Sequence, residues 1–278
     1  MRAQGKDGIA EKESARGANE GDEMRLTHLS LFTGIGGIDL AAEWAGFETV
    51  GQCEWAEYPR RVLEKHWPAV PRWGDVCDLT GKDFYDKTGL RTVDIISGGF
   101  PCQPHSAIGK RRGKKDERHL WPQFLRVIRE IQPTWVVGEN VNGILQTVHE
   151  EVCSGLENEG YEVRTFSIPA CAVSAPHERY RVFIIALSES KPGLQADSKT
   201  SSVGSGGETR QNPVRGFGDY VPGTYWTTHQ PEICRVDDGF PDGMDEYRQR
   251  MTALGNAVVP QQIYPIFEAI AEIERRVR

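Results

Sequence analysis

The chain has 278 residues, of which 38% are apolar and 26% are charged, and its formal net charge is -7. This composition is ordinary for a globular protein and excludes collagen-like and wholly disordered classes. The acidic balance argues against a protein that coats nucleic acid indiscriminately, although it leaves room for a local basic surface. No apolar run approaches the roughly 18 residues that a membrane helix requires, and the polar N-terminus lacks the pattern of a secretory signal. We therefore expect a soluble, intracellular protein.

Six cysteines are scattered along the chain without a Cys-x-x-Cys pair, and the histidines form no cluster at metal-ligand spacing. The pattern favours reduced thiols over a disulfide framework and indicates no metal site. The cysteines are Cys53, Cys77, Cys102, Cys153, Cys171 and Cys234.

Residues 1–23 hold almost no large apolar side chain and are rich in Gly, Ala, Glu and Lys. Such a segment buries too little apolar surface to offset the entropy of ordering, so we expect a disordered tail. Met24 directly precedes a strand-like run, and we expect the folded part to begin there. Met24 is also a candidate for the biological start, with the earlier residues read through from upstream.

From residue 27 onward, short apolar runs alternate with amphipathic stretches. Continuous apolar strands separated by helices predict an α/β, doubly wound and mostly parallel sheet covered on both faces. The runs YEVRTFSI and RVFIIAL are separated by a polar connection and are expected to form an antiparallel pair at one side of that sheet. The other expected strands are HLSLF, TVGQCE, VDIISGG and WVVGEN, and the expected helices lie at about 37–45, 60–66 and 122–131.

After residue 188 the composition shifts to Gly, Ser, Thr, Asp and Pro, and apolar periodicity fades until about residue 245. This change predicts a small irregular region. The final stretch PQQIYPIFEAIAEIERR regains helical spacing of its apolar residues, so we expect a helix that starts near Pro260 to close the chain.

A glycine-rich turn at residues 32–37 (FTGIGG) joins the first expected strand to the first expected helix. Glycines let the backbone approach a ligand closely, and a helix N-terminus offers free N–H groups. The signal is weak alone, because such turns often hold no ligand and the spacing departs from the dinucleotide G-x-G-x-x-G pattern. Glu54, Trp55 and Asp75 follow later strands, where α/β proteins bind adenosine-bearing cofactors. Each acid alone is more often a solvated loop residue, but together with the turn they favour a cofactor site.

Cys102 lies in the loop GGFPCQP at the carboxyl end of the strand VDIIS, the edge where open sheets place active sites. A cysteine in an α/β core is usually inert packing, whereas this loop position favours exposure and nucleophilic attack. Glu139 ends the following strand, so we expect its carboxylate at the same edge as a candidate acid.

Taken in order, these motifs resemble the DNA (cytosine-5)-methyltransferase family, in the compact form familiar among phage and prophage members. The resemblance covers residues 27–187 and 253–275. Each motif is modest alone, but seven in family order argue against coincidence. The motifs are FTGIGG (32–37), CEW (53–55), GDV (74–76), PCQ (101–103), ENV (139–141), RYR (179–181) and GNAVVP (255–260).

The resemblance implies a Rossmann-like fold of the AdoMet-dependent methyltransferase type, with S-adenosylmethionine as methyl donor. It implies that Cys102 attacks C6 of cytosine as a thiolate while Glu139 protonates N3, which makes C5 nucleophilic. Arg179 and Arg181 are implied to steady the base carbonyl and the catalytic groups. Alternation along ERYRVF places both arginines on one face of a strand, and an exposed strand is the plainer alternative.

The family's cofactor contacts carry over to ten positions of this chain. The glycine turn is implied to line the methionine and ribose side, Glu54 to take the ribose hydroxyls, and Trp55 to pack on adenine. Because residues 256–257 are implied to close the pocket, we expect the last helix to pack back against the first strands. The ten residues are Phe32, Gly34, Ile35, Gly37, Glu54, Trp55, Asp75, Val76, Asn256 and Ala257.

Residues 109–118 hold six basic and two acidic side chains, soon after Cys102. A charge run is usually a solvated face, but this position favours a loop that closes over a flipped base and meets DNA phosphates. Residues 188–253 hold ten acidic and seven basic side chains and are expected to be a short target-recognition region. The expected DNA contacts are Gln103, Ser106, Lys110, Arg111, Arg112 and Arg235.

The expected organisation is a tail at 1–23, a catalytic domain at 24–187, a target-recognition region at 188–253, and a segment at 254–278 that returns to the catalytic domain. The leading interpretation is an active, monomeric enzyme on double-stranded DNA in the cytoplasm of a prokaryotic or phage-infected cell. No membrane or metal partner is expected. A tRNA cytosine methyltransferase and a catalytically silent DNA-binding relative stay open, as do the recognition sequence and any restriction partner.

Overall fold

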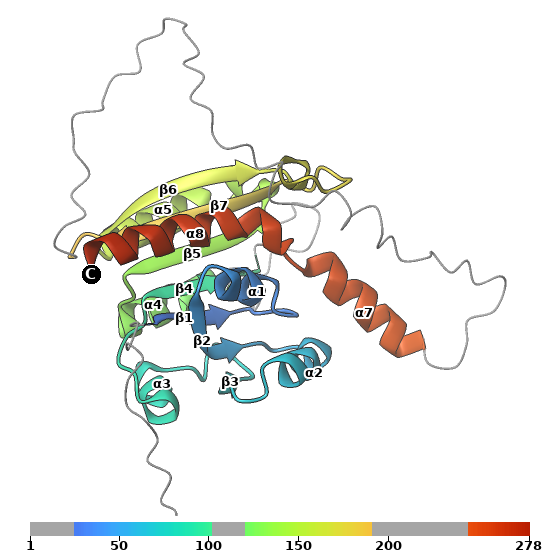
Figure 1. The fold of residues 1–278 in the computed structure, drawn as a ribbon, viewed down its shortest axis with the longest axis horizontal. Coiled ribbons are helices and arrows are strands. Elements are labelled where there is room, and N and C mark those ends of the chain that lie inside the picture. Colours follow the sequence, from blue (N-terminus) through green and yellow to red (C-terminus); the bar gives the residue numbers. More distant parts are fainter. Residues whose placement is uncertain (1–24, 102–119, 191–243) are drawn as a thin grey trace, which may run out of the picture.

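A seven-stranded sheet lies between two layers of helices in the computed structural model, which describes residues 25–101, 120–190 and 244–278 (Figure 1). The strand order is β3-β2-β1-β4-β5-β7-β6. The first five strands in this order pair in parallel, and β7 pairs antiparallel with both β5 and β6. The strands are β1 Leu26–Leu31, β2 Phe47–Cys53, β3 Arg72–Trp73, β4 Ile95–Gly98, β5 Trp135–Val141, β6 Tyr161–Ile168 and β7 Arg181–Ser188. The predicted mostly parallel α/β sheet and its antiparallel pair are confirmed.

The helices follow the predicted pattern in part. The expected helices near 37–45, 60–66 and 122–131 and the closing helix at Pro260 are all present within a few residues. Helices α3, α5 and α7 were not expected, and α7 occupies the end of the region expected to be irregular. Thr80 signals α3, because its hydroxyl caps the helix by accepting a hydrogen bond from Asp83 N. The helices are α1 Gly37–Trp44, α2 Glu57–His66, α3 Gly81–Thr88, α4 Trp121–Ile131, α5 His149–Asn158, α7 Met244–Asn256 and α8 Pro260–Val277, with 3-10 turns η1 Asn142–Gln146 and η2 Ala170–Val173.

Each face of the sheet has its own apolar core. Neighbouring residues of one strand point to opposite faces, so Ile96 and Val136 join the core beneath α3, α4 and α5, while Ile95 and Val137 join the core beneath α1 and α8. Burial on both faces explains why these strands read as continuous apolar runs.

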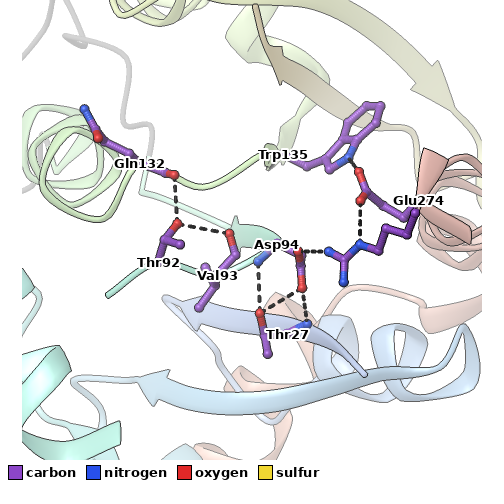
Figure 2. Close-up of polar contacts among 8 residues, drawn as sticks. Thr27, Thr92, Val93, Asp94, Gln132, Trp135 and Glu274 are labelled. Carbon is purple, nitrogen blue, oxygen red and sulfur yellow. Dashed lines mark hydrogen bonds and ion pairs between the residues drawn. The ribbon is translucent and has the colours of Figure 1, made fainter. Parts of the chain in front are cut away.

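The C-terminal helix is fastened at the amino-terminal edge of the sheet, as Figure 2 shows. Glu274 is fully buried and accepts a hydrogen bond from Trp135 Nε1 at 2.8 Å. Arg278 pairs with both Glu274 and Asp94, and Asp94 accepts hydrogen bonds from the backbone N and the hydroxyl of Thr27 at 2.8 and 3.0 Å. This edge lies opposite the carboxyl ends of the parallel strands, so the cluster holds α8 without occupying the functional edge.

No helix within the described ranges is long and apolar enough to cross a membrane. The same ranges contain no group of three or more His, Cys, Asp or Glu side chains placed to hold a metal ion. The cysteines at positions 53, 77, 153 and 171 are free thiols, of which Cys53 is buried and Cys77 and Cys171 are exposed.

His28 is fully buried in β1 and bridges the two neighbouring strands. Its ring nitrogens lie 3.0 Å from Thr49 Oγ1 on β2 and 2.7 Å from Ser97 Oγ on β4. Burial lowers the pKa of His28 to about 3, so the imidazole of the folded protein is neutral.

Stability toward acid is therefore expected to depend on His28. The unfolded imidazole takes up a proton near pH 6.5 and the folded one only near pH 3, so this group should lower the free energy of unfolding by about 1.4 kcal/mol per pH unit as the pH falls between those values. Urea titrations across this range should show that dependence lost in His28→Gln and kept in His66→Gln, which changes an exposed histidine. The same pH dependence in His28→Gln and wild type would contradict the prediction.

Candidate cofactor and catalytic site

The glycine turn between β1 and α1 has the backbone of a ligand-binding loop. Phe32, Gly34 and Gly36 all have positive φ, at 51°, 59° and 86°. A Cβ added to Gly34 would meet no atom within 4 Å, so the space beside this residue is open, whereas one at Gly36 would lie 2.5 Å from the Trp67 ring. Gly36 is therefore fixed by packing, and Gly34 leaves the backbone accessible at the carboxyl edge of β1.

A buried carboxylate behind the turn holds α1 against the sheet. Asp39 is fully buried and accepts 2.8 Å hydrogen bonds from Ser30 Oγ on β1 and Gln52 Nε2 on β2. Burial raises the pKa of Asp39 to about 6, against the opposing effect of these hydrogen bonds. We did not predict a role for this residue, although an acid in the first turn of an otherwise apolar helix face was a visible signal.

Glu54 reaches the glycine turn directly. Its Oε2 accepts a hydrogen bond from Gly34 N, and its Oε1 accepts one from Ala56 N, both at 2.7 Å. The neighbouring Trp55 has 76% of its surface exposed, so its ring is available to a ligand. The structure thus brings together the turn and the carboxylate that the resemblance assigns to cofactor binding, and the exposed Trp55 directly follows that carboxylate in the chain.

Asp75 and Val76 follow β3 and complete the same edge. Asp75 Oδ1 accepts a hydrogen bond from Cys77 N at 2.8 Å, which makes a tight turn. The Val76 side chain is buried in the core, and its carbonyl accepts a 2.8 Å hydrogen bond from Arg126 Nη2. Any ligand contact by Val76 must therefore use its backbone.

The segment between α7 and α8 covers the start of α1. A Cβ added to Gly37 would lie 2.7 Å from Val258 O, so only glycine admits this close approach. Phe267 of α8 packs edge-on against the rings of His28 and Phe47, which confirms that the last helix packs against the first strands. The Asn256 side chain is exposed. The contact with the turn is made by Val258, a member of the motif GNAVVP that we did not single out.

Glu139 is a buried acid paired with an arginine. The residue is 8% exposed, and its Oε1 lies 2.9 Å from Arg181 Nε on the adjacent strand. Burial raises the pKa of Glu139 to about 7, against the opposing effect of the Arg181 and Arg179 guanidiniums. A carboxyl group with this pKa is able to donate and accept a proton near neutral pH.

The same acid lies over the loop that leads to Cys102. A Cβ added to Gly99 would lie 2.8 Å from Glu139 Oε2, so a larger residue at position 99 would displace the carboxyl group from its present position. Asn140 Nδ2 donates a 2.8 Å hydrogen bond to Phe100 O, and the Phe100 ring packs against Trp121 and Phe124. The sequence predicted no separate role for Asn140, and the structure shows that it anchors this loop.

Arg179 departs from the prediction. The prediction that both arginines lie on one face of a strand is wrong. Strand β7 begins only at Arg181, and Arg179 precedes it with a left-handed backbone at φ 32°. Arg179 Nη2 instead donates hydrogen bonds to Gly255 O and Ala257 O, both at 2.7 Å. Its charge still acts on Glu139, but its side chain reaches the C-terminal segment.

A model of the family described as C-5 cytosine-specific DNA methylase matches residues 26–216, more than half of the chain. The chain belongs to this family. The match includes the glycine turn, Glu54 and the Glu139–Arg181 pair, whereas Val258, which covers the start of α1, lies outside it.

Type II methyltransferases of bacteria are among the similar proteins of this methylase family. M.BsuFI of Bacillus subtilis is 29% identical over 230 residues, which is 80% of this chain and 53% of the relative. M.HhaI of Haemophilus parahaemolyticus is 33% identical over 169 residues, which is 58% of this chain and 49% of the relative. The chain therefore spans about half the length of the curated relatives that it matches.

Solved structures of methyltransferases share the fold. A DNA modification methyltransferase encoded within an E. coli prophage matches with a TM-score of 0.52 and 27% identity over 59% of this chain and 47% of that chain. The Dnmt2 methyltransferase of S. pombe matches with a TM-score of 0.52 and 25% identity over 60% of this chain and 52% of that one. The α/β architecture is thus that of known methyltransferases.

Several predicted site residues lie outside the described residues. They include the candidate nucleophile and all of the expected DNA contacts, so their roles stay predictions. These residues are Cys102, Gln103, Ser106, Lys110, Arg111, Arg112 and Arg235. The tail at 1–23 and most of the 188–253 region also lie outside the description, and the expected boundary at 253–254 falls within α7.

Proposed function

We propose that this methylase-family chain transfers a methyl group from S-adenosylmethionine to C5 of cytosine in duplex DNA. The observation that carries the proposal is the buried Glu139, which is paired with Arg181 and lies over Gly99 in the loop leading to Cys102. An acid with a pKa near 7 beside the loop of a candidate thiol nucleophile suits a reaction in which a ring nitrogen must be protonated and then released.

The glycine edge of the site fits S-adenosylmethionine. The open space beside Gly34 leaves room for a ligand against the turn, the Glu54 carboxylate is an acceptor for hydroxyls, and the exposed Trp55 ring is a surface for a purine. When bound there, S-adenosylmethionine supplies an activated methyl group. Val258 and its neighbours complete this edge by covering the start of α1.

The chain's own residues divide the chemistry of the base. Cys102 attacks C6 as a thiolate, and Glu139 holds a proton at N3, so negative charge does not accumulate on the ring and C5 becomes nucleophilic. Arg181 fixes the Glu139 carboxyl in place through its 2.9 Å contact. After methylation, a water molecule takes the C5 proton, the C5–C6 double bond forms, and the bond from C6 to Cys102 breaks with loss of the thiolate. N3 then returns its proton to Glu139.

Transfer of tritiated methyl groups tests this function directly. The full chain is incubated with labelled S-adenosylmethionine and either duplex DNA or tRNA, and bisulfite sequencing then locates the modified cytosines. Label in duplex DNA supports the proposal. Label in tRNA alone would show the RNA enzyme instead, and DNA binding without transfer to either nucleic acid would show a silent relative.

Glu54→Ala is expected to weaken binding of S-adenosylmethionine by about 1–3 kcal/mol, because ribose hydroxyls lose a charged acceptor. Calorimetry should show this loss in Glu54→Ala, a smaller loss in Glu54→Gln, which keeps an acceptor for Gly34 N, and none in Glu57→Ala, an exposed acid nearby. An unchanged dissociation constant in a folded Glu54→Ala variant would refute the cofactor assignment.

We also propose that the protein is a monomeric, phage- or prophage-like enzyme that acts on double-stranded DNA in the cytoplasm of a prokaryotic or phage-infected cell. The prophage-encoded methyltransferase among the similar structures and the bacterial relatives support this context. Sedimentation of the purified chain with and without a DNA duplex measures the stoichiometry, and a stable dimer would contradict the monomer.

A further inference from the structure

At the joint between the RYR segment and the C-terminal segment, a side chain from each segment donates hydrogen bonds to main-chain carbonyls of the other. Arg179 Nη2 donates to Gly255 O and Ala257 O, each at 2.7 Å. In return, the fully buried Gln262 of α8 donates from Nε2 to Arg179 O at 2.9 Å and to Ile168 O at 2.8 Å. Three hydrogen bonds, all of which involve Arg179, therefore tie the two segments together, and the fourth ties α8 to the end of β6 at Ile168.

The charge of Arg179 suits its position at the end of a helix. The last carbonyls of a helix lack intrahelical partners and carry partial negative charge. Gly255 lies in the last turn of α7, which ends at Asn256, and the Ala257 carbonyl directly follows. A guanidinium there satisfies two carbonyls and stabilises the connection from α7 to α8.

Two features of this joint destabilise the folded state, so a contribution to stability does not explain them. Arg179 has a φ of 32°, which is strained for a side chain other than glycine. Arg179 Nε and Gln262 Oε1 are buried without a hydrogen-bond partner in the described part of the chain. Strained backbone and unsatisfied buried atoms tend to persist where function requires them.

The joint connects the two halves of the candidate site. Two residues after Arg179, Arg181 pairs with Glu139, and one residue after Ala257, Val258 lies over Gly37 at the start of α1. We propose that Arg179 is a positioning residue that latches segment 255–258 onto the start of β7 and thereby couples the cofactor edge to the Glu139–Arg181 pair. This inference rests on the proposed function, and it places the Arg179 guanidinium on the latch rather than on the target base.

Hydrogen–deuterium exchange tests the latch without cofactor or DNA. Arg179→Ala is expected to speed amide exchange in residues 253–262 by at least about tenfold, because the two hydrogen bonds that close this joint are lost. Arg179→Lys should recover part of the protection, since an ammonium also donates to carbonyls. Arg164→Ala, an exposed arginine on β6, is the matched control and should leave exchange unchanged. If Arg179→Ala fails to fold, Gln262→Met opens the same joint from the other side and should speed the same amides.

Kinetics distinguish the latch from a direct contact with the base. Arg179→Ala should raise the KM for S-adenosylmethionine about tenfold and leave kcat at saturating cofactor within about twofold, with partial rescue by Arg179→Lys. Arg181→Ala should instead lower kcat and shift its pH profile. Unchanged exchange together with an unchanged KM and a lower kcat in Arg179→Ala would overturn the latch. If the wild-type chain transfers no methyl group, the proposed function fails, but the exchange result still decides whether the latch exists.

Discussion

Glu139→Gln is expected to lower methyl transfer to duplex DNA by about a hundredfold to ten-thousandfold, the range over which a positioned acid contributes to catalysis. Glutamine keeps the size and one acceptor of the side chain, but its amide N–H is too weak an acid to transfer a proton to N3. Tritiated methyl transfer under saturating S-adenosylmethionine measures the loss. Glu162→Gln, which changes an exposed acid on β6, is the matched control and should retain wild-type turnover.

The pH dependence provides a second readout of Glu139. Burial raises its pKa to about 7, so the active, protonated form is depleted as the pH rises through that value. The kcat/KM for DNA is expected to fall about tenfold per pH unit on the alkaline side, where the group of the free enzyme titrates. A Glu139→Gln variant that keeps wild-type turnover, or a wild-type profile flat through this range, would remove Glu139 as the acid.

Cys102→Ser is expected to abolish methyl transfer within the limits of detection while the affinity for S-adenosylmethionine persists. A hydroxyl near neutral pH provides far less nucleophile than a thiol, and the cofactor edge is built by other residues. Labelled methyl transfer measures the first quantity and calorimetry the second.

Other cysteines supply the controls for this assignment. Cys77→Ser and Cys171→Ser change exposed thiols and should spare catalysis. Cys53 also lies at the end of a strand, but it is buried and burial raises its pKa to about 12, so it does not provide a thiolate. Turnover of Cys102→Ser comparable to wild type would show that the nucleophile lies elsewhere.

The sheet could be predicted from the sequence because its signals are local. Apolar runs such as those of β5 and β7 are continuous, and the β6 strand matches its expected bounds. The α5 helix was missed because only Val152 and Leu156 are buried along it, which is a weak periodic signal. Helix α3 was missed although its Thr80 cap was visible.

By itself, the sequence determined the family resemblance, the class of sheet, and which chemical groups follow the strands at its carboxyl edge. Motif identity and apolar periodicity are properties of neighbouring residues, so they can be read along the chain. Only the tertiary structure decided that Val258 covers Gly37, and that Arg179 leaves the strand to hold the carbonyls of Gly255 and Ala257. These contacts join segments far apart in the chain, and their geometry depends on how α8 packs across the sheet rather than on local spacing. The raised pKa of Glu139 likewise follows from burial, which exists only once both cores have formed.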